Sequence, residues 1–242
     1  MRPSTCTPRR NTGRLLRGAT IALGLAACLW ALAACTGSKP PVPEWQMNAH
    51  SAAEKATQAY LAGDTRVADL EWNRARAEVA RTGRADRLAR LELMRCAAQV
   101  ASLDLQPCAP FDALRAHADP ADRAYADYLA GRADAAATAL LPEPQRSAAA
   151  AMAGSAGSSG GLAAIADPLS RLVAAGAALQ AGRASAEAAV IATDTASDQG
   201  WRRPLLAWLL LRARQAEQGG NTREAAALRQ RIELIERGGA PS

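Results

Sequence analysis

The sequence contains very little of what a β-sheet is built from. Among its 242 residues there is one Phe, and Val and Ile together number 11. Alanine, the strongest helix former, occupies 62 positions. Strands are built mainly from β-branched and aromatic residues, so a β-sandwich, a β-barrel and a doubly wound sheet are all disfavoured. The composition predicts an all-α protein.

Histidines and N-terminal acidic residues are also scarce. The two histidines, His50 and His117, are too few for most multi-histidine metal sites, and we expect both on the surface rather than in catalysis. The first 34 residues hold five arginines and no acidic residue, whereas 24 basic residues face 23 acidic ones downstream. Five of the six formal positive charges therefore lie in the N-terminal segment. A nearly neutral body argues against nucleic acid as a partner, and we expect neither a metal nor a cofactor.

The first 34 residues have the organisation of an export signal. Five arginines, the last at Arg17, precede an uncharged run at 19–34. As a helix this run would span roughly 24 Å, less than the ~30 Å hydrocarbon core of a bilayer. A basic region, a short apolar region and small residues at its end are typical of a cleaved secretory signal.

The end of this segment, Leu32-Ala33-Ala34-Cys35, resembles the lipobox of bacterial lipoproteins. The resemblance implies cleavage after Ala34, a diacylglycerol on the Cys35 sulfur and acylation of the new amino group. A similar pattern ends at Cys28, but cleavage there would leave an apolar stretch at the start of the mature chain. An ordinary cleaved signal and an uncleaved anchor are the alternatives.

Thr36, rather than Asp, follows Cys35. In enteric-type sorting this implies delivery to the periplasmic face of the outer membrane, with the inner membrane as the alternative. Residues 35–44 then form a lipidated tether, because Pro40, Pro41 and Pro43 favour an extended polyproline conformation.

The rest of the chain has the pattern of helices separated by glycine turns. Apolar spacing predicts a helix over 49–62, and the helix over 201–218 is apolar nearly all round, so we expect it to be the most buried. Asp64, Asp119, Asp167 and Asn221 are candidate N-caps. We expect helical-hairpin regions at 45–150 and 162–238, a Gly/Ser linker at 151–161 and a disordered tail at 239–242.

A short pattern recurs where helices end. Tyr60-Leu61-Ala62-Gly63, with Ala68 in the next helix, is echoed by Tyr128-Leu129-Ala130-Gly131 with Ala136, and the two glycines are 68 residues apart. This resembles two periods of the tetratricopeptide repeat. The resemblance implies antiparallel helical hairpins stacked as a solenoid with a concave surface for a protein or peptide. Because the turns are not evenly spaced, an irregular antiparallel bundle is the alternative.

Two cysteines and several aromatic residues are the candidate site residues of the body. Cys96 and Cys108, 12 residues apart, could form a disulfide in an oxidising periplasm, contributing roughly 2–3 kcal/mol, or remain two buried thiols. Trp72 and Trp208 lie on apolar stripes and are expected in the core. The candidate partner-binding residues are Trp45, Tyr60, Trp201, Arg202 and Arg203, because Trp and Arg are enriched in interface hot spots.

These features favour a membrane-anchored periplasmic lipoprotein that acts as a non-catalytic scaffold or adaptor for an envelope protein. One alternative is a carrier of a small molecule or lipid, which requires an enclosed apolar cavity. The other is an enzyme acting on cell-wall glycan, which requires a carboxylate in a cleft. Glu71, Glu78 and Glu92 are the carboxylates considered for that role, although solvated helix faces also explain them.

Overall fold

The computed structural model describes residues 41–132, 134–153 and 159–238. These residues form helices joined by turns, and no strand occurs among them, so the predicted all-α class is confirmed. The predicted signal and lipobox, including Ala34 and Cys35, lie outside the described residues, as do the middle of the Gly/Ser linker and the C-terminal tail. Within the described ranges, no helix has the length and apolar character needed to cross a membrane.

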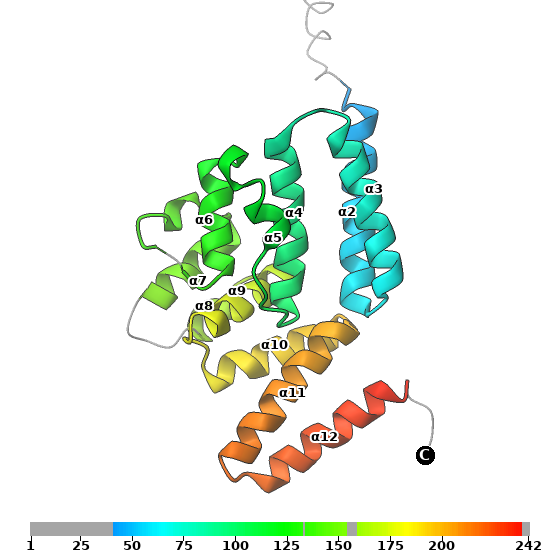
Figure 1. The fold of residues 1–242 in the computed structure, drawn as a ribbon. Helices are drawn as coiled ribbons and strands as arrows, with labels where there is room; N and C mark the ends of the chain where they lie inside the picture. Colours follow the sequence, from blue (N-terminus) through cyan, green and yellow to red (C-terminus); the bar gives the residue numbers. More distant parts are fainter. Residues whose placement is uncertain (1–40, 133, 154–158, 239–242) are drawn as a thin grey trace, which may run out of the picture. The chain divides into compact units, whose positions relative to one another are not determined.

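Helices that follow one another in the chain pack as antiparallel pairs at both ends of the described part (Figure 1). The N-terminal pair is α2 (Glu44–Ala62) with α3 (Thr65–Ala80), and the C-terminal pair is α11 (Arg202–Gln218) with α12 (Thr222–Glu236). The elements between them are α4 (Ala85–Ala101), α5 (Ala109–Asp112), η1 (Arg115–His117), α6 (Pro120–Leu129), η2 (Thr138–Leu140), α7 (Glu143–Ala153), α8 (Ser159–Leu162), α9 (Pro168–Gln180) and α10 (Ala186–Asp198).

Several helices end with the same pair of hydrogen bonds. The Gly63 amide donates to the Tyr60 carbonyl at 3.1 Å, and the Asp64 amide donates to the Ala59 carbonyl at 2.9 Å. The same pairing, with the glycine in the left-handed conformation, occurs at four further turns, those of Gly131, Gly182, Gly200 and Gly220. This is the Schellman motif, which satisfies the last carbonyls of a helix. The sequence echo between Tyr60 and Tyr128 therefore corresponds to a shared way of ending a helix.

The predicted repeat is wrong after Gly131, because Ala136, unlike Ala68, does not lie in a helix. It lies in the turn before η2. The Asp134 carboxylate accepts a hydrogen bond from the Ala136 amide at 3.0 Å, and the Asp134 carbonyl accepts one from the Ala137 amide at 3.0 Å. These local bonds close a turn where the pattern predicted a helix.

The first helix begins at Glu44, five residues earlier than predicted. The Pro43 carbonyl accepts hydrogen bonds from the amides of Gln46 and Met47, at 3.0 and 3.3 Å. No Ser, Thr, Asp or Asn marks this start, so the sequence gives no sign of a helix cap here. Glu44 is therefore the first residue of α2 rather than the last residue of the predicted tether, and Trp45 lies in its first turn.

The prediction that 201–218 would be the most buried helix is wrong, because α9 contains a longer unbroken run of buried residues. Every residue from Leu172 to Ala178 is buried, whereas Leu210 on α11 is 41% exposed. The reason is the close approach of α9 to α4: an added Cβ on Gly176 would overlap the carbonyl group of Val100. Small residues around α9 also let it contact α6, α7, α8 and α10.

The buried side chains form two clusters. The smaller joins α2 and α3 to the start of α4 and contains Trp72; the larger runs from α4 to α12 and contains Trp208, so both tryptophans are in the core as predicted. The Trp208 indole donates to the Ala101 carbonyl at 3.1 Å. The larger cluster includes residues from both sides of the predicted linker, such as Phe111 and Leu172.

Candidate functional site

Two of the predicted partner-binding residues contact each other inside the chain. The Arg203 guanidinium lies over the Tyr60 ring, with its Cζ 4.3 Å from the ring centroid. Its Nε donates to the Tyr60 carbonyl and its Nη2 to the Thr65 hydroxyl, each at 2.7 Å. Arg203 therefore connects the start of α11 to the turn between α2 and α3, and two of its nitrogen atoms donate hydrogen bonds there.

The other three predicted residues are divided between two places. Trp201 precedes α11 and is half-buried against the larger core cluster, and the neighbouring Arg202 is exposed. Trp45 lies 15 residues before Tyr60 on the same helix, which separates the two by about 22 Å along the helix axis. The structure thus gathers Tyr60, Trp201, Arg202 and Arg203 near the start of α11 and leaves Trp45 elsewhere.

Trp45 lies beside a groove between α2 and α4, with a volume of about 440 Å³. The α2 wall includes Gln46 and His50, and the α4 wall includes Arg87, Arg90 and Met94. Small and apolar side chains that are themselves buried form its floor: Ala49, Ala53, Val79 and Leu91. A groove with this floor has room for side chains from outside the chain.

Three arginines line this groove, and they are paired differently. Arg84 binds Asp86 through two hydrogen bonds, at 2.8 and 2.6 Å, and this contact lowers the pKa of the Asp86 carboxyl to about 2. Arg90 lies 3.3 Å from Asp119, and it also pairs with the carboxylate of Asp122.

Arg87 differs from both of its neighbours. Its guanidinium lies over the Trp45 ring, with Cζ 5.1 Å from the centroid, and it makes no ion pair with any described residue. A cation on the face of an indole is attracted by the ring quadrupole but keeps its N–H donors free at the edges. Arg87 is therefore a cation positioned by an aromatic ring, with donors available to a ligand.

A second cleft continues from the first along α4. It has a volume of about 420 Å³ and lies between α4, α6 and the segment after η2. Arg90 and Met94 line both clefts, so we treat the two as one surface, the α4 groove. Met94 is 41% exposed and Leu140, in the second cleft, is 47% exposed. The second cleft also contains Leu93, Tyr125, Leu141, Pro142 and Arg146.

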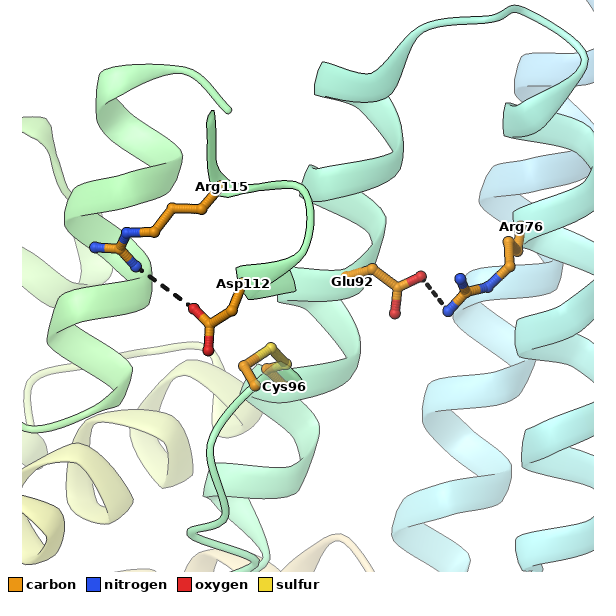
Figure 2. The surroundings of a disulfide bond; sticks show 6 residues. Arg76, Glu92, Cys96, Asp112 and Arg115 are labelled. Atoms are coloured by element: carbon orange, nitrogen blue, oxygen red, sulfur yellow. Dashed lines mark ion pairs between the residues drawn. A yellow bond between two sulfur atoms is a disulfide. The ribbon is translucent and has the colours of Figure 1, made fainter. Parts of the chain in front are cut away.

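The carboxylates considered for catalysis each pair with an arginine. Glu92 on α4 is buried and pairs with Arg76 on α3 (Figure 2). Burial raises the pKa of Glu92, and the nearby charges of Arg76 and Arg95 oppose this effect. Glu78 pairs with Arg81 at 3.1 Å and Glu71 with Arg74 at 3.9 Å. Glu92 therefore holds α3 against α4.

Cys96 and Cys108 are joined by a disulfide, with their Cα atoms 6.0 Å apart (Figure 2). The bridge connects α4 to the start of α5, where Phe111 is fully buried. Next to it, Asp112 lies 3.8 Å from Arg115, which also pairs with Asp127 at 2.6 Å. These contacts fix the irregular segment between α4 and α6.

The histidines lie on the surface, as predicted. His50 is exposed and lies 3.1 Å from Glu54, and His117 is also exposed. Among the residues that the structure describes, no three His, Cys, Asp or Glu side chains are grouped so that they could hold a metal ion.

Sequence reasoning identified Trp45 but missed Arg87 and Met94. Arg84, Arg87, Arg90 and Met94 are spaced by three, three and four residues, which places them on one side of α4. That spacing was visible in the sequence, but the nearness of α2 was not. Comparisons with protein-family models, with curated proteins and with solved structures found no match to this chain.

Proposed function

We propose that this chain is a membrane-anchored lipoprotein whose helical body is a non-catalytic scaffold for a protein partner in the bacterial envelope. The observation that carries the scaffold role is the α4 groove. It combines a floor of small apolar side chains, an exposed Met94 and an arginine held on an aromatic ring. Aromatic residues, Met and Arg are enriched in protein interfaces.

The anchoring part of the proposal rests on the sequence before the described residues. Leu32-Ala33-Ala34-Cys35 supplies the lipobox, and eight residues separate Cys35 from the first helical residue, Glu44. Several acyl chains on one N-terminal cysteine give stable membrane attachment. Because Thr36 rather than Asp follows Cys35, the location we propose is the periplasmic face of the outer membrane.

We also propose that the hairpins are degenerate tetratricopeptide-like repeats. The shared Schellman turns at Gly63, Gly131, Gly182, Gly200 and Gly220 support this proposal. Stacked hairpins of this kind build extended surfaces for partners, which agrees with a scaffold role.

The anchoring proposal is tested with two cysteine variants expressed as the full chain. Cys35→Ser is expected to abolish both the incorporation of labelled palmitate and the cleavage of the signal peptide. Cys28→Ser is the matched control, because it ends a similar four-residue pattern, and it is expected to behave as the parent. Palmitate labelling that survives Cys35→Ser or is lost with Cys28→Ser would contradict the proposal.

The scaffold proposal is tested with a photo-crosslinking amino acid placed at Met94 in the full chain in cells. We expect an adduct with another envelope protein. The control position is Leu234 on α12, which is 60% exposed and lies outside the α4 groove. Equal adducts at both positions, or none at Met94, would count against a scaffold that uses this surface.

A further inference from the structure

The charge of the α4 groove indicates what kind of partner it accepts. Its α2–α4 part is lined by Arg84, Arg87 and Arg90, and only one of these three arginines makes no ion pair with a described residue. That arginine is Arg87, because Arg84 pairs with Asp86 and Arg90 pairs with two aspartates. A carboxylate brought by a ligand would form charge-assisted hydrogen bonds with Arg87, about twice as strong as bonds between neutral groups. Trp45 already orients the guanidinium, which reduces the entropy lost on binding.

The walls of the groove indicate the conformation of the partner. Both walls are helices, whose central backbone groups are hydrogen-bonded within each helix, so they offer an extended peptide little backbone pairing. A partner helix satisfies its own backbone and needs only side-chain contacts. The α2 residues that line the groove, at 45, 46, 49, 50 and 53, follow one face for two turns. Ala49 and Ala53 on this face leave space for the ridge of an incoming helix.

The apolar part of the groove indicates that this helix is amphipathic. Met94 stands where the two clefts meet, and Leu140 continues the apolar surface beyond it. Methionine adapts its shape to different apolar side chains. Arg87 and Met94 are seven residues apart on α4, about 10 Å along its axis, so one partner helix can reach both.

We propose that the α4 groove binds an acidic amphipathic helix of the partner protein, with a partner carboxylate on Arg87 and partner apolar side chains on Met94. This inference rests on the proposed scaffold function. It predicts the chemistry of the bound segment and its dependence on one charge, neither of which a scaffold role alone requires.

The experiment identifies the peptide that is crosslinked to position 94 in the full, membrane-attached chain by mass spectrometry. We expect a segment rich in Glu or Asp with apolar residues at helical spacing. A basic segment, a proline-rich extended segment, a lipid, or a segment of a second copy of this chain would overturn the inference.

Charge variants then test the contact at Arg87. Arg87→Glu is expected to reduce the adduct at position 94 at least about tenfold, as for the loss of a charge pair at an interface. Changing the acidic residues of the captured segment to Lys is expected to restore it. Arg214→Glu is the matched control, because Arg214 is exposed on α11 and lies outside the groove. Arg87 forms no ion pair with a described residue, so the change removes only its exposed contact with Trp45 and should lower the thermal unfolding temperature only slightly.

The outcomes separate this inference from the proposed function. A protein adduct that persists in Arg87→Glu leaves the scaffold role standing and overturns the acidic helix. The absence of any protein adduct at position 94 contradicts both. An acidic helical segment whose capture requires Arg87 and is restored by charge exchange supports both.

Discussion

Gly176 on α9 and Val100 on α4 are in direct backbone contact. A Cβ built on Gly176 would overlap the Val100 carbonyl and would lie 2.8 Å from the Val100 Cγ1 atom. Only hydrogen fits at position 176 with the two helices at their present separation. Because α9 is buried along most of its length, this contact sets the packing of the larger core cluster.

The contact predicts that Gly176→Ala destabilises the fold by about 1–3 kcal/mol, the usual effect of overpacking a core. Gly161→Ala on α8 is the control, because a Cβ there meets its nearest atoms at 3.7 Å, an ordinary contact. Urea unfolding followed by circular dichroism gives both free energies. Similar values for the two variants would show that α4 and α9 are not packed as described.

Gly131 and Gly182 provide a matched pair of turns. Both adopt a positive φ, so alanine at either position is expected to destabilise by about 1–2 kcal/mol. At Gly182 an added Cβ meets open space, whereas at Gly131 it would come within 2.7 Å of the Ala181 amide nitrogen. We therefore expect Gly131→Ala to cost at least about 1 kcal/mol more than Gly182→Ala. Equal losses in urea unfolding would indicate that the turns after α6 and α9 do not touch.

The ion pair between Arg76 and Glu92 predicts that replacing one partner destabilises the fold more than replacing the other. Arg76→Ala leaves a buried carboxylate unpaired and is expected to destabilise by about 1–3 kcal/mol, less than a fully buried pair because Arg76 is partly exposed. Glu92→Gln removes the buried charge itself and is expected to have a smaller effect. The unfolding free energies of the two variants are compared at neutral pH. A larger loss of stability in Glu92→Gln than in Arg76→Ala would contradict this prediction.

The same pair predicts a pH dependence for Arg76→Ala. Burial raises the pKa of Glu92, so the folded protein holds a proton on this group more tightly than the unfolded chain does. As the pH falls from ~7 toward ~4, Glu92 takes up a proton and the cost of the missing arginine should shrink. As the pH rises through the folded pKa, the cost should return. Urea unfolding of the variant and the parent across this range measures the difference.

The disulfide between Cys96 and Cys108 predicts a moderate loss of stability on reduction. Closing a loop of this length contributes roughly 2–3 kcal/mol in the chain-entropy model. The reduced protein is still expected to fold, because buried Phe111 holds α5 against the core. The double variant Cys96→Ala, Cys108→Ala is the control and should not respond to reductant. If reductant leaves the midpoint of the parent unchanged, the bridge does not contribute as described.

Residue preferences made many helix ends predictable from the sequence, but the end of α4 was not among them. Gly63 and Gly131 were recognised because glycine readily adopts the left-handed conformation. The same pair of bonds ends α4 at Leu103, which has a φ of 58° although it is not glycine. Nothing in the sequence at this position signals such a turn. In this strained conformation, Leu103 packs against the larger core cluster.

The candidate site was predictable only in part, for a similar reason. Trp45 was identified as a surface aromatic, but its role depends on Arg87, 42 positions later, and on the approach of α2 to α4. The sequence places Arg203 among the candidate surface residues, yet two of its nitrogen atoms donate hydrogen bonds to Tyr60 and Thr65 in a distant part of the chain. Contacts between distant segments decide which arginines remain available, and a pattern of spacing does not contain them.

The mass of the intact mature chain, extracted from bacterial envelopes, is the decisive test of lipid attachment. A lipoprotein processed at the lipobox begins at Cys35 and carries acyl groups on that residue. An unmodified chain, a chain that retains residues 1–34, or one that begins at another position would contradict the proposed lipid attachment.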